Sequence, residues 1–239
     1  MDRHIHTFTT SGYGYRAKES GSRFSNSPFS QSRRRFIFLK SVIFFSILYK
    51  VSSFKCFSFT FTIFSGKTAL NLSIKTADEE DAIYILANDP DADRLAIAQK
   101  LSDGTWKIFN GNEIGSLLGW WQLKVHEFGD SNDFKRENLY YIASAVSSKM
   151  LGTIAKKEGL NFCQTLTGFK WMANKAYDLE RNPEKKVLLA YEEAIGFMCG
   201  TQVLDKDGIS AAIRAAELMA FLDTKGMTLD SKLKELYTE

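Results

Sequence analysis

Cysteine, proline and histidine are scarce in this chain, which has 239 residues and only 3 of each. The cysteines Cys56, Cys163 and Cys199 are too few and too scattered for a disulfide framework or a CxxC metal site. This favours a reducing, cytoplasmic setting. The histidines stand in no motif, so histidine catalysis is not expected. A hydrophobic content of 44% and only 16 Gly exclude a wholly disordered or collagen-like chain.

Long apolar runs are also absent from the sequence. The longest uncharged apolar stretches are residues 41–49 and 56–66, which are well short of the ~20 residues that a membrane-spanning helix needs. A signal peptide would carry its apolar region closer to the N-terminus. We therefore expect no membrane partner.

Acidic residues are nearly missing from the first third of the chain. Residues 1–75 contain 12 Lys or Arg and 2 acids, a net charge of +10, whereas the remainder carries −7. The same segment holds 12 of the 19 Phe and shows no clear helical or strand period. The run Arg33–Arg35 is weak evidence for a nucleic-acid arm, and no nucleic-acid partner is expected. We interpret residues 1–75 as a basic, Phe- and Ser-rich leader that is disordered and unrelated to the rest.

From residue 81 onward the pattern alternates between short apolar strands and amphipathic helices. Strands are predicted at 82–87, 95–98 and 106–109, with Asp103-Gly104 as a hairpin turn and a helix over 113–124 capped by Asn112. Further strands at 139–146, 162–166 and 187–191 alternate with helices at 148–158, 170–180, 209–222 and 229–237. This order predicts an α/β fold, a three-layer α/β/α arrangement around a mixed, mostly parallel sheet. In such folds the chemistry lies beyond the carboxyl ends of the strands.

Three aspartates follow the first of these strands directly. Asp89, Asp91 and Asp93 are spaced i, i+2 and i+4, which in an extended segment points all three carboxylates the same way. Such a cluster repels itself unless a cation or solvent lies between its members. Oxygen ligands without His or Cys favour Mg²⁺ over zinc. Arg94, next in the chain, can hold a phosphate or neutralise the loop.

Other interpretations of this acidic loop compete with a magnesium site. A calcium-binding EF-hand does not fit, because Arg94 and Lys100 stand where its glycine and final glutamate belong. A phosphatase of the haloacid dehalogenase type also has D-x-D after a strand, but it usually has Thr or Val at the position of Asp93. A solvated acidic turn without a ligand is the third alternative.

Several motifs together resemble the α-D-phosphohexomutase superfamily, in its phosphopentomutase and phosphoglucomutase 2 branch, which also contains a glucose-1,6-bisphosphate synthase. The motifs are residues 87–94 (ANDPDADR), 109–113 (FNGNE), 118–121 (LGWW), 146–149 (VSSK), 165–172 (TLTGFKWM), 191–198 (YEEAIGFM) and 203–208 (VLDKDG). The resemblance covers residues 77–239. It implies an isomerase of carbohydrate metabolism that moves a phosphate between hydroxyls of one sugar through a bisphosphorylated intermediate. It also implies that residues 76–112 end the family's second domain and that 113–239 form its third.

The resemblance assigns roles to particular residues. Asp89, Asp91 and Asp93 would bind Mg²⁺, and Arg94 would support the phosphoryl group. Lys206 would exchange a proton with the reacting hydroxyl, and in a cationic pocket its pKa would be lowered.

The sugar side of the site is implied in the same way. Glu192 would accept hydrogen bonds from sugar hydroxyls. Thr167 and Gly168 would belong to a loop that contacts the sugar, and Ala194 stands where many relatives have a sugar-binding serine.

Two family motifs do not occur in the sequence. It contains no Thr-x-Ser-His-Asn-Pro phosphoserine loop and no Arg-x-Ser-Gly-Thr-x-Pro phosphate loop. The resemblance therefore implies an incomplete sugar-phosphate mutase, with ribose, deoxyribose or glucose phosphates as possible substrates. The alternatives are a non-catalytic fragment that binds a metal or a sugar phosphate, and a haloacid dehalogenase-like phosphatase.

Overall fold

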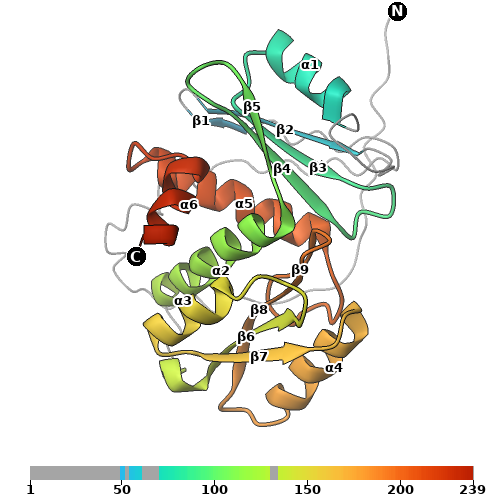
Figure 1. Cartoon of the computed structure of the whole chain (residues 1–239), viewed down its shortest axis with the longest axis vertical. Helices are drawn as coiled ribbons and strands as arrows, with labels where there is room; N and C mark the ends of the chain where they lie inside the picture. Colours follow the sequence, from blue (N-terminus) through green and yellow to red (C-terminus); the bar gives the residue numbers. More distant parts are fainter. Residues whose placement is uncertain (1–48, 52–53, 61–69, 130–133, 239) are drawn as a thin grey trace, which may run out of the picture. The chain divides into compact units, whose positions relative to one another are not determined.

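The computed structural model describes residues 49–51, 54–60, 70–129 and 134–238, which form two sheets and the helices around them (Figure 1). Within these ranges, every helix is too short or too polar to cross a membrane.

The first sheet has the strand order β1-β2-β3-β4-β5. Its strands are β1 (Tyr49–Val51), β2 (Phe54–Thr60), β3 (Tyr84–Asn88), β4 (Leu95–Lys100) and β5 (Trp106–Phe109). β2 pairs in parallel with β3, and the other neighbours pair antiparallel. The predicted hairpin between β4 and β5 is confirmed, and Thr105 N donates to Asp103 Oδ1 (2.9 Å) in its turn.

The two faces of the first sheet pack against different partners. Ile85 and Ala98 face α1 (Asn71–Glu79), where Ala77 is fully buried. Leu86 and Ile97 belong instead to the main core of the chain. Because successive side chains of a strand point to opposite faces, β3 and β4 are buried on both sides.

The second sheet has the strand order β7-β6-β8-β9. Its strands are β6 (Leu139–Ser144), β7 (Asn161–Thr165), β8 (Lys186–Glu192) and β9 (Gly196–Met198). β7 and β8 run parallel to β6, and β9 runs antiparallel to β8. The predicted mixed, mostly parallel sheet is confirmed.

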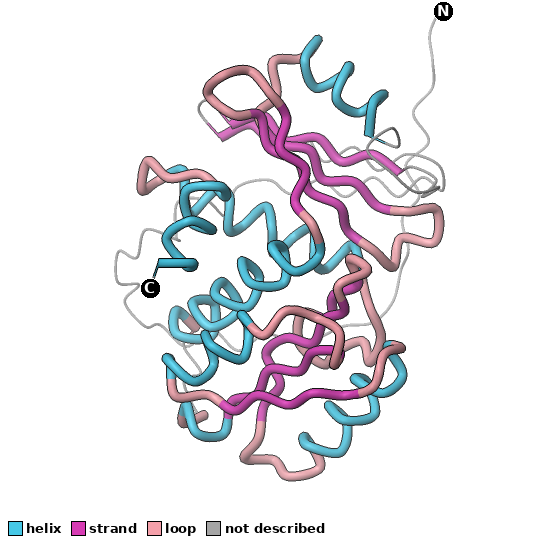
Figure 2. Tube along the Cα trace, viewed as in Figure 1, coloured by secondary structure: helices cyan, strands magenta, loops and turns pink. Residues whose placement is uncertain are grey.

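Helices cover both faces of this second sheet (Figures 1 and 2). α4 (Phe169–Glu180) packs on one face with Ile142 and Ala190. The other face, with Tyr141 and Tyr191, belongs to the core of α2 (Gly111–Phe128), α3 (Met150–Glu158), α5 (Gly208–Asp223) and α6 (Leu229–Thr238). A 3₁₀ turn, Arg136–Asn138, precedes β6. The expected three-layer α/β/α arrangement is therefore present.

Some expected element boundaries are wrong. The cap of α2 is Asn110 rather than Asn112, since Glu113 N donates to Asn110 Oδ1 (3.0 Å) and Asn110 N donates to Glu113 Oε2 (2.8 Å). Asn112 instead accepts a hydrogen bond from Ser148 N (2.8 Å). β9 was not predicted, because a strand of three residues after a turn shows no period in the sequence.

Part of the predicted leader is also structured. β1, β2 and the start of α1 all lie within residues 1–75, which were expected to be disordered. The reason is tertiary: the buried strand β3 needs a hydrogen-bonding neighbour on each edge, and β2 supplies one of them. The aromatic composition of β2 is also typical of strands. The rest of this prediction falls outside the described residues, and the boundaries at residues 75 and 112 stay predictions.

Candidate functional site

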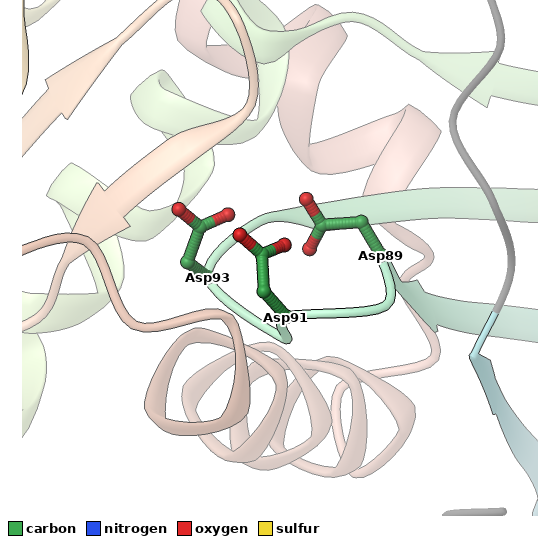
Figure 3. Close-up of side chains that lie close together, drawn as sticks. All are labelled: Asp89, Asp91 and Asp93. Atoms are coloured by element: carbon green, nitrogen blue, oxygen red, sulfur yellow. The ribbon is translucent and has the colours of Figure 1, made fainter. Parts of the chain in front are cut away.

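The acidic loop after β3 gathers its three aspartates in one place. One carboxylate oxygen from each of Asp89, Asp91 and Asp93 lies within 4.8 Å of the others, and Figure 3 shows the carboxylates on one side of the loop. Asp89 is buried, Asp93 half-buried and Asp91 exposed. The loop is a turn rather than the extended segment expected from the spacing. The carboxylates therefore converge because the chain curls around them.

Hydrogen bonds of backbone and side-chain atoms hold this turn in shape. Ala92 has a positive φ of 60°, and its N–H donates to Asp89 O (2.9 Å). Arg94 N donates to Asp89 Oδ1 (3.0 Å), and Asn88 Nδ2 donates to Arg94 O (2.6 Å). Gly208 N, at the start of α5, donates to Ala92 O (3.1 Å). The acidic loop is thus attached to a helix that follows the second sheet in the chain.

The chemistry of the loop fits a hard divalent cation. Burial raises the pKa of Asp89, and the charges of Asp93 and Asp91 raise it further, while the hydrogen bond from Arg94 N opposes the shift. Asp93 Oδ1 is buried and has no hydrogen-bond partner among the described residues. A buried carboxylate oxygen without a partner is costly unless a ligand satisfies it. A cation among these oxygens would remove both the repulsion and the unsatisfied acceptor.

Side chains from the segment before α5 and from the end of β8 lie beside the same loop. Lys206 Nζ lies 2.8 Å from Asp93 Oδ2. A Cβ on Gly196 would lie 3.0 Å from both Glu192 Oε1 and Lys206 Cδ, so these two side chains flank one backbone position. Glu192 ends β8 and is 8% exposed. Glu192, Lys206 and the acidic loop therefore form one site.

Backbone pairing joins the two parts of the site. Arg94 forms an isolated β-bridge with Gly196, and Leu95 N donates to Ile195 O (3.1 Å). The Arg94 side chain stays by the carboxylates, with Nε 3.9 Å from Asp89 Oδ2 and 3.8 Å from Asp93 Oδ1. The position of Arg94 is thus determined by its backbone bridge to Gly196 and by the attraction of its guanidinium to the two carboxylates.

The pKa of Lys206 moves in the opposite direction to the prediction. Its hydrogen bond with Asp93 raises the pKa, and burial opposes this rise only in part. The expected cationic pocket is an acidic one, and it holds the proton on Lys206. Burial also raises the pKa of Glu192, against the charges of Lys206 and Arg94.

The predicted sugar-contacting residues lie around this centre. Thr167 and Gly168 follow the carboxyl end of β7, and Gly168 has a positive φ of 108°. The next residue, Phe169, has its ring centroid 5.9 Å from Lys206 Nζ. Ala194 is exposed in the turn between β8 and β9. The structure therefore brings the β7–α4 turn beside Lys206, while contacts of Thr167 and Ala194 with a sugar stay predictions.

One part of the site was missed from the sequence. Glu193 Oε2 accepts hydrogen bonds from Ser144 Oγ (2.9 Å) and Ser147 Oγ (3.2 Å), which lie at the carboxyl end of β6. The available signal was that the Ser-Ser and Glu-Glu motifs each follow a strand of one predicted parallel sheet. Neighbouring parallel strands bring their carboxyl ends together.

Known proteins match this chain in both sequence and fold. Residues 110–239 match the phosphoglucomutase/phosphomannomutase family, alpha/beta/alpha domain III. The chain is 51% identical over 174 residues to phosphopentomutase and 48% identical over 172 residues to glucose 1,6-bisphosphate synthase, both from Homo sapiens. These alignments cover 73% and 72% of this chain but 28% of each relative, so the chain spans under a third of their length.

A solved structure shares the fold. It is a phosphoglucomutase/phosphomannomutase family protein from Burkholderia thailandensis, with a TM-score of 0.53 and 20% identity over 70% of this chain and 31% of that chain. On the match of residues 110–239, the chain belongs to the phosphoglucomutase/phosphomannomutase family, and these residues are its α/β/α domain III.

Proposed function

We propose that this chain supplies the metal loop and the sugar-binding part of a sugar-phosphate mutase of the phosphopentomutase type. Such an isomerase moves a phosphoryl group between two hydroxyls of one sugar through a bisphosphorylated sugar. The observation that carries the proposal is the contact of Lys206 Nζ with Asp93 Oδ2 (2.8 Å), which joins the acidic loop to the Glu192 end of β8. Family membership makes this chemistry preferable to that of a haloacid dehalogenase-like phosphatase.

The acidic loop would hold the metal and the phosphoryl group. Asp89, Asp91 and Asp93 would hold Mg²⁺, which when bound neutralises charge on the phosphoryl oxygens. Arg94, held by its backbone bridge to Gly196, would donate hydrogen bonds to the same group.

The second sheet would bind and orient the sugar. Glu192 would accept hydrogen bonds from two sugar hydroxyls, with Thr167, Gly168 and Ala194 around the ring. Lys206 would donate a hydrogen bond to a sugar oxygen and exchange a proton with the reacting hydroxyl. The sequence identity that this chain shares with phosphopentomutase and with glucose 1,6-bisphosphate synthase supports pentose or hexose phosphates as the substrate class.

The printed sequence has no Thr-x-Ser-His-Asn-Pro loop, so the serine that carries the phosphoryl group must come from outside these 239 residues. A covalent phosphoryl carrier cannot be replaced by binding energy. We therefore expect these residues by themselves to bind Mg²⁺ and sugar phosphate but not to isomerise ribose 1-phosphate.

The first experiment measures binding by the purified chain. Mg²⁺ is titrated by calorimetry, and α-D-ribose 1-phosphate is titrated by NMR with and without Mg²⁺. We expect Asp91→Asn to abolish Mg²⁺ binding, whereas the control Asp178→Asn, an exposed acid on α4, leaves it unchanged. Mg²⁺ binding by Asp91→Asn equal to that of the original chain contradicts the proposed metal site.

The second experiment asks whether these residues support catalysis. Residues 77–239 replace the aligned segment of a phosphopentomutase, and conversion of ribose 1-phosphate to ribose 5-phosphate is assayed. We expect the chimera to be active and its Asp91→Asn variant to be inactive. A folded chimera that binds Mg²⁺ and ribose 1-phosphate without turnover would favour the non-catalytic fragment instead.

A further inference from the structure

Two buried hydroxyls bind the carboxylate of Glu193. Its Oε2 lies 2.9 Å from Ser144 Oγ and 3.2 Å from Ser147 Oγ, and these hydroxyl oxygens are 2.7 Å from each other. Ser144 is 0% exposed and Ser147 is 3% exposed. A carboxylate that accepts hydrogen bonds from two buried hydroxyls is costly to displace, because hydroxyls bound only to each other leave one donor unsatisfied.

The turn that begins at Glu193 connects Glu192 to a residue that contacts the strand after the acidic loop. It follows Glu192 directly, and Ile195 within it has a positive φ of 56°. That region is unfavourable for a β-branched residue, so surrounding contacts have to maintain the turn. Ile195 O accepts the hydrogen bond from Leu95 N (3.1 Å), at the strand that leaves the acidic loop.

Helix α2 encloses the same turn from another side. A Cβ on Gly111 would lie 2.1 Å from Glu193 O, so the helix backbone rests directly on this carbonyl. The turn is therefore held at its first residue by the end of β6 and the start of α2, and at its last residues by the acidic loop.

We propose that Glu193 is a positioning residue, and that its bonds to Ser144 and Ser147 hold the turn so that Glu192 faces the sugar. This inference rests on the proposed function. Glu193 begins the turn directly after β8. Its carboxylate contacts the end of β6, whereas the carboxylate of Glu192, the last residue of β8, flanks Gly196 together with Lys206.

The test uses the full chain, NMR titration with α-D-ribose 1-phosphate at saturating Mg²⁺, and calorimetry for Mg²⁺. We expect Glu193→Ala to raise the Kd for ribose 1-phosphate about tenfold, the scale of losing one charged hydrogen-bonded contact. The Kd for Mg²⁺ should stay within about twofold, because all three carboxylates belong to another loop. Glu193→Gln keeps an oxygen acceptor for the serines and should restore most of the affinity. The exposed Glu184→Ala is the matched control.

A double-mutant cycle distinguishes a positioning role of Glu193 from a general destabilisation of the fold by Glu193→Ala. If Glu193 acts through Glu192, adding Glu193→Ala to Glu192→Ala changes the Kd for ribose 1-phosphate by less than about twofold. A full additional loss in that background overturns the inference, as does wild-type affinity of Glu193→Ala. If Glu193→Ala does not fold, Ser147→Ala replaces it, with a several-fold rise in Kd expected and an unchanged Kd overturning the inference.

The same titrations distinguish failure of the proposed function. An original chain that does not bind ribose 1-phosphate, or a Glu192→Ala variant that binds it normally, overturns the proposed function and with it this inference. Normal binding by the original chain, loss in Glu192→Ala and no loss in Glu193→Ala overturn the positioning role of Glu193 alone.

Discussion

Lys206 Nζ lies 2.8 Å from Asp93 Oδ2, and this ion pair joins the segment before α5 to the acidic loop after β3. Both side chains are partly shielded, with 20% and 26% exposed. In the described structure, the ammonium therefore supplies part of the positive charge that three clustered carboxylates require. A bound cation would share these carboxylates with Lys206.

Lys206→Met should affect the two ligands in opposite directions. Removing the ammonium removes its repulsion of a cation in the loop, so Mg²⁺ should bind about tenfold more tightly. Ribose 1-phosphate should bind more weakly, because the proposed site loses a charged hydrogen-bond donor. Calorimetry measures the first effect and NMR titration the second. Lys206→Arg, which keeps the charge, should retain the original Mg²⁺ affinity; weaker Mg²⁺ binding by Lys206→Met contradicts this account.

Gly208→Ala should damage the acidic loop from the side of α5. The added methyl would lie 2.2 Å from Arg94 O and 2.5 Å from Asn88 Nδ2, and backbone cannot move away as a flexible side chain can. We expect overpacking to cost about 1–3 kcal/mol of stability. Thermal melting checks the stability, and calorimetry should show weaker Mg²⁺ binding. Gly129→Ala, whose methyl meets nothing closer than 3.5 Å, should leave both unchanged. A Gly208→Ala chain that melts and binds Mg²⁺ like Gly129→Ala would contradict the close contact.

Asp89→Asn should stabilise the metal-free chain at neutral pH. Burial raises the pKa of Asp89 above its ordinary value of 3.8, so folding takes up a proton between that value and the raised one. The contribution of this group to the free energy of unfolding therefore falls as the pH rises through that window. Asparagine keeps an oxygen for the Arg94 N–H and carries no charge.

Melting in chelator and in Mg²⁺ tests this prediction. In chelator, Asp89→Asn should melt above the original chain at neutral pH, and the difference should vanish on acidification. In Mg²⁺ only the original chain should gain stability, since the metal needs the ionised carboxylate. A variant that melts lower in chelator at neutral pH indicates that charged Asp89 stabilises the fold.

The pair Lys107–Asp230 should contribute to docking of α6 on the first sheet. Lys107 Nζ lies 2.8 Å from Asp230 Oδ1, and the side chains are 25% and 13% exposed. Burial raises the pKa of Asp230, but Lys107 and Lys234 outweigh it and lower the pKa. This stabilisation is therefore present above the ordinary value of 3.8 and is lost as the pH falls through the lowered pKa.

A double-mutant cycle of Lys107→Met and Asp230→Asn, followed by denaturant unfolding, measures this pair. We expect a coupling of about 1 kcal/mol at neutral pH, because the pair is only partly shielded from solvent. The coupling should disappear in strong acid. Additive effects at neutral pH would mean that this ion pair does not contribute to the docking of α6.

Local features of this protein could be predicted from its sequence. The strand before Asp89, the Asp103-Gly104 hairpin and the alternating helices and strands after residue 110 each depend on neighbouring residues. The three aspartates at their spacing also marked the candidate metal loop without tertiary information, although the loop is a turn and not the extended segment that was expected.

Other features required contacts between distant segments. The pKa of Lys206 is raised rather than lowered because α5 begins beside Asp93, and residue spacing alone contains no such proximity. β2 lies beside the buried strand β3 and pairs with it in parallel, a contact between segments far apart in the sequence. The sequence by itself determined which residues carry charge and chemistry and where the local elements lie. Only the tertiary structure decided which charges meet and that Glu193 binds the end of β6, because electrostatic and hydrogen-bond energies depend on distances that packing sets.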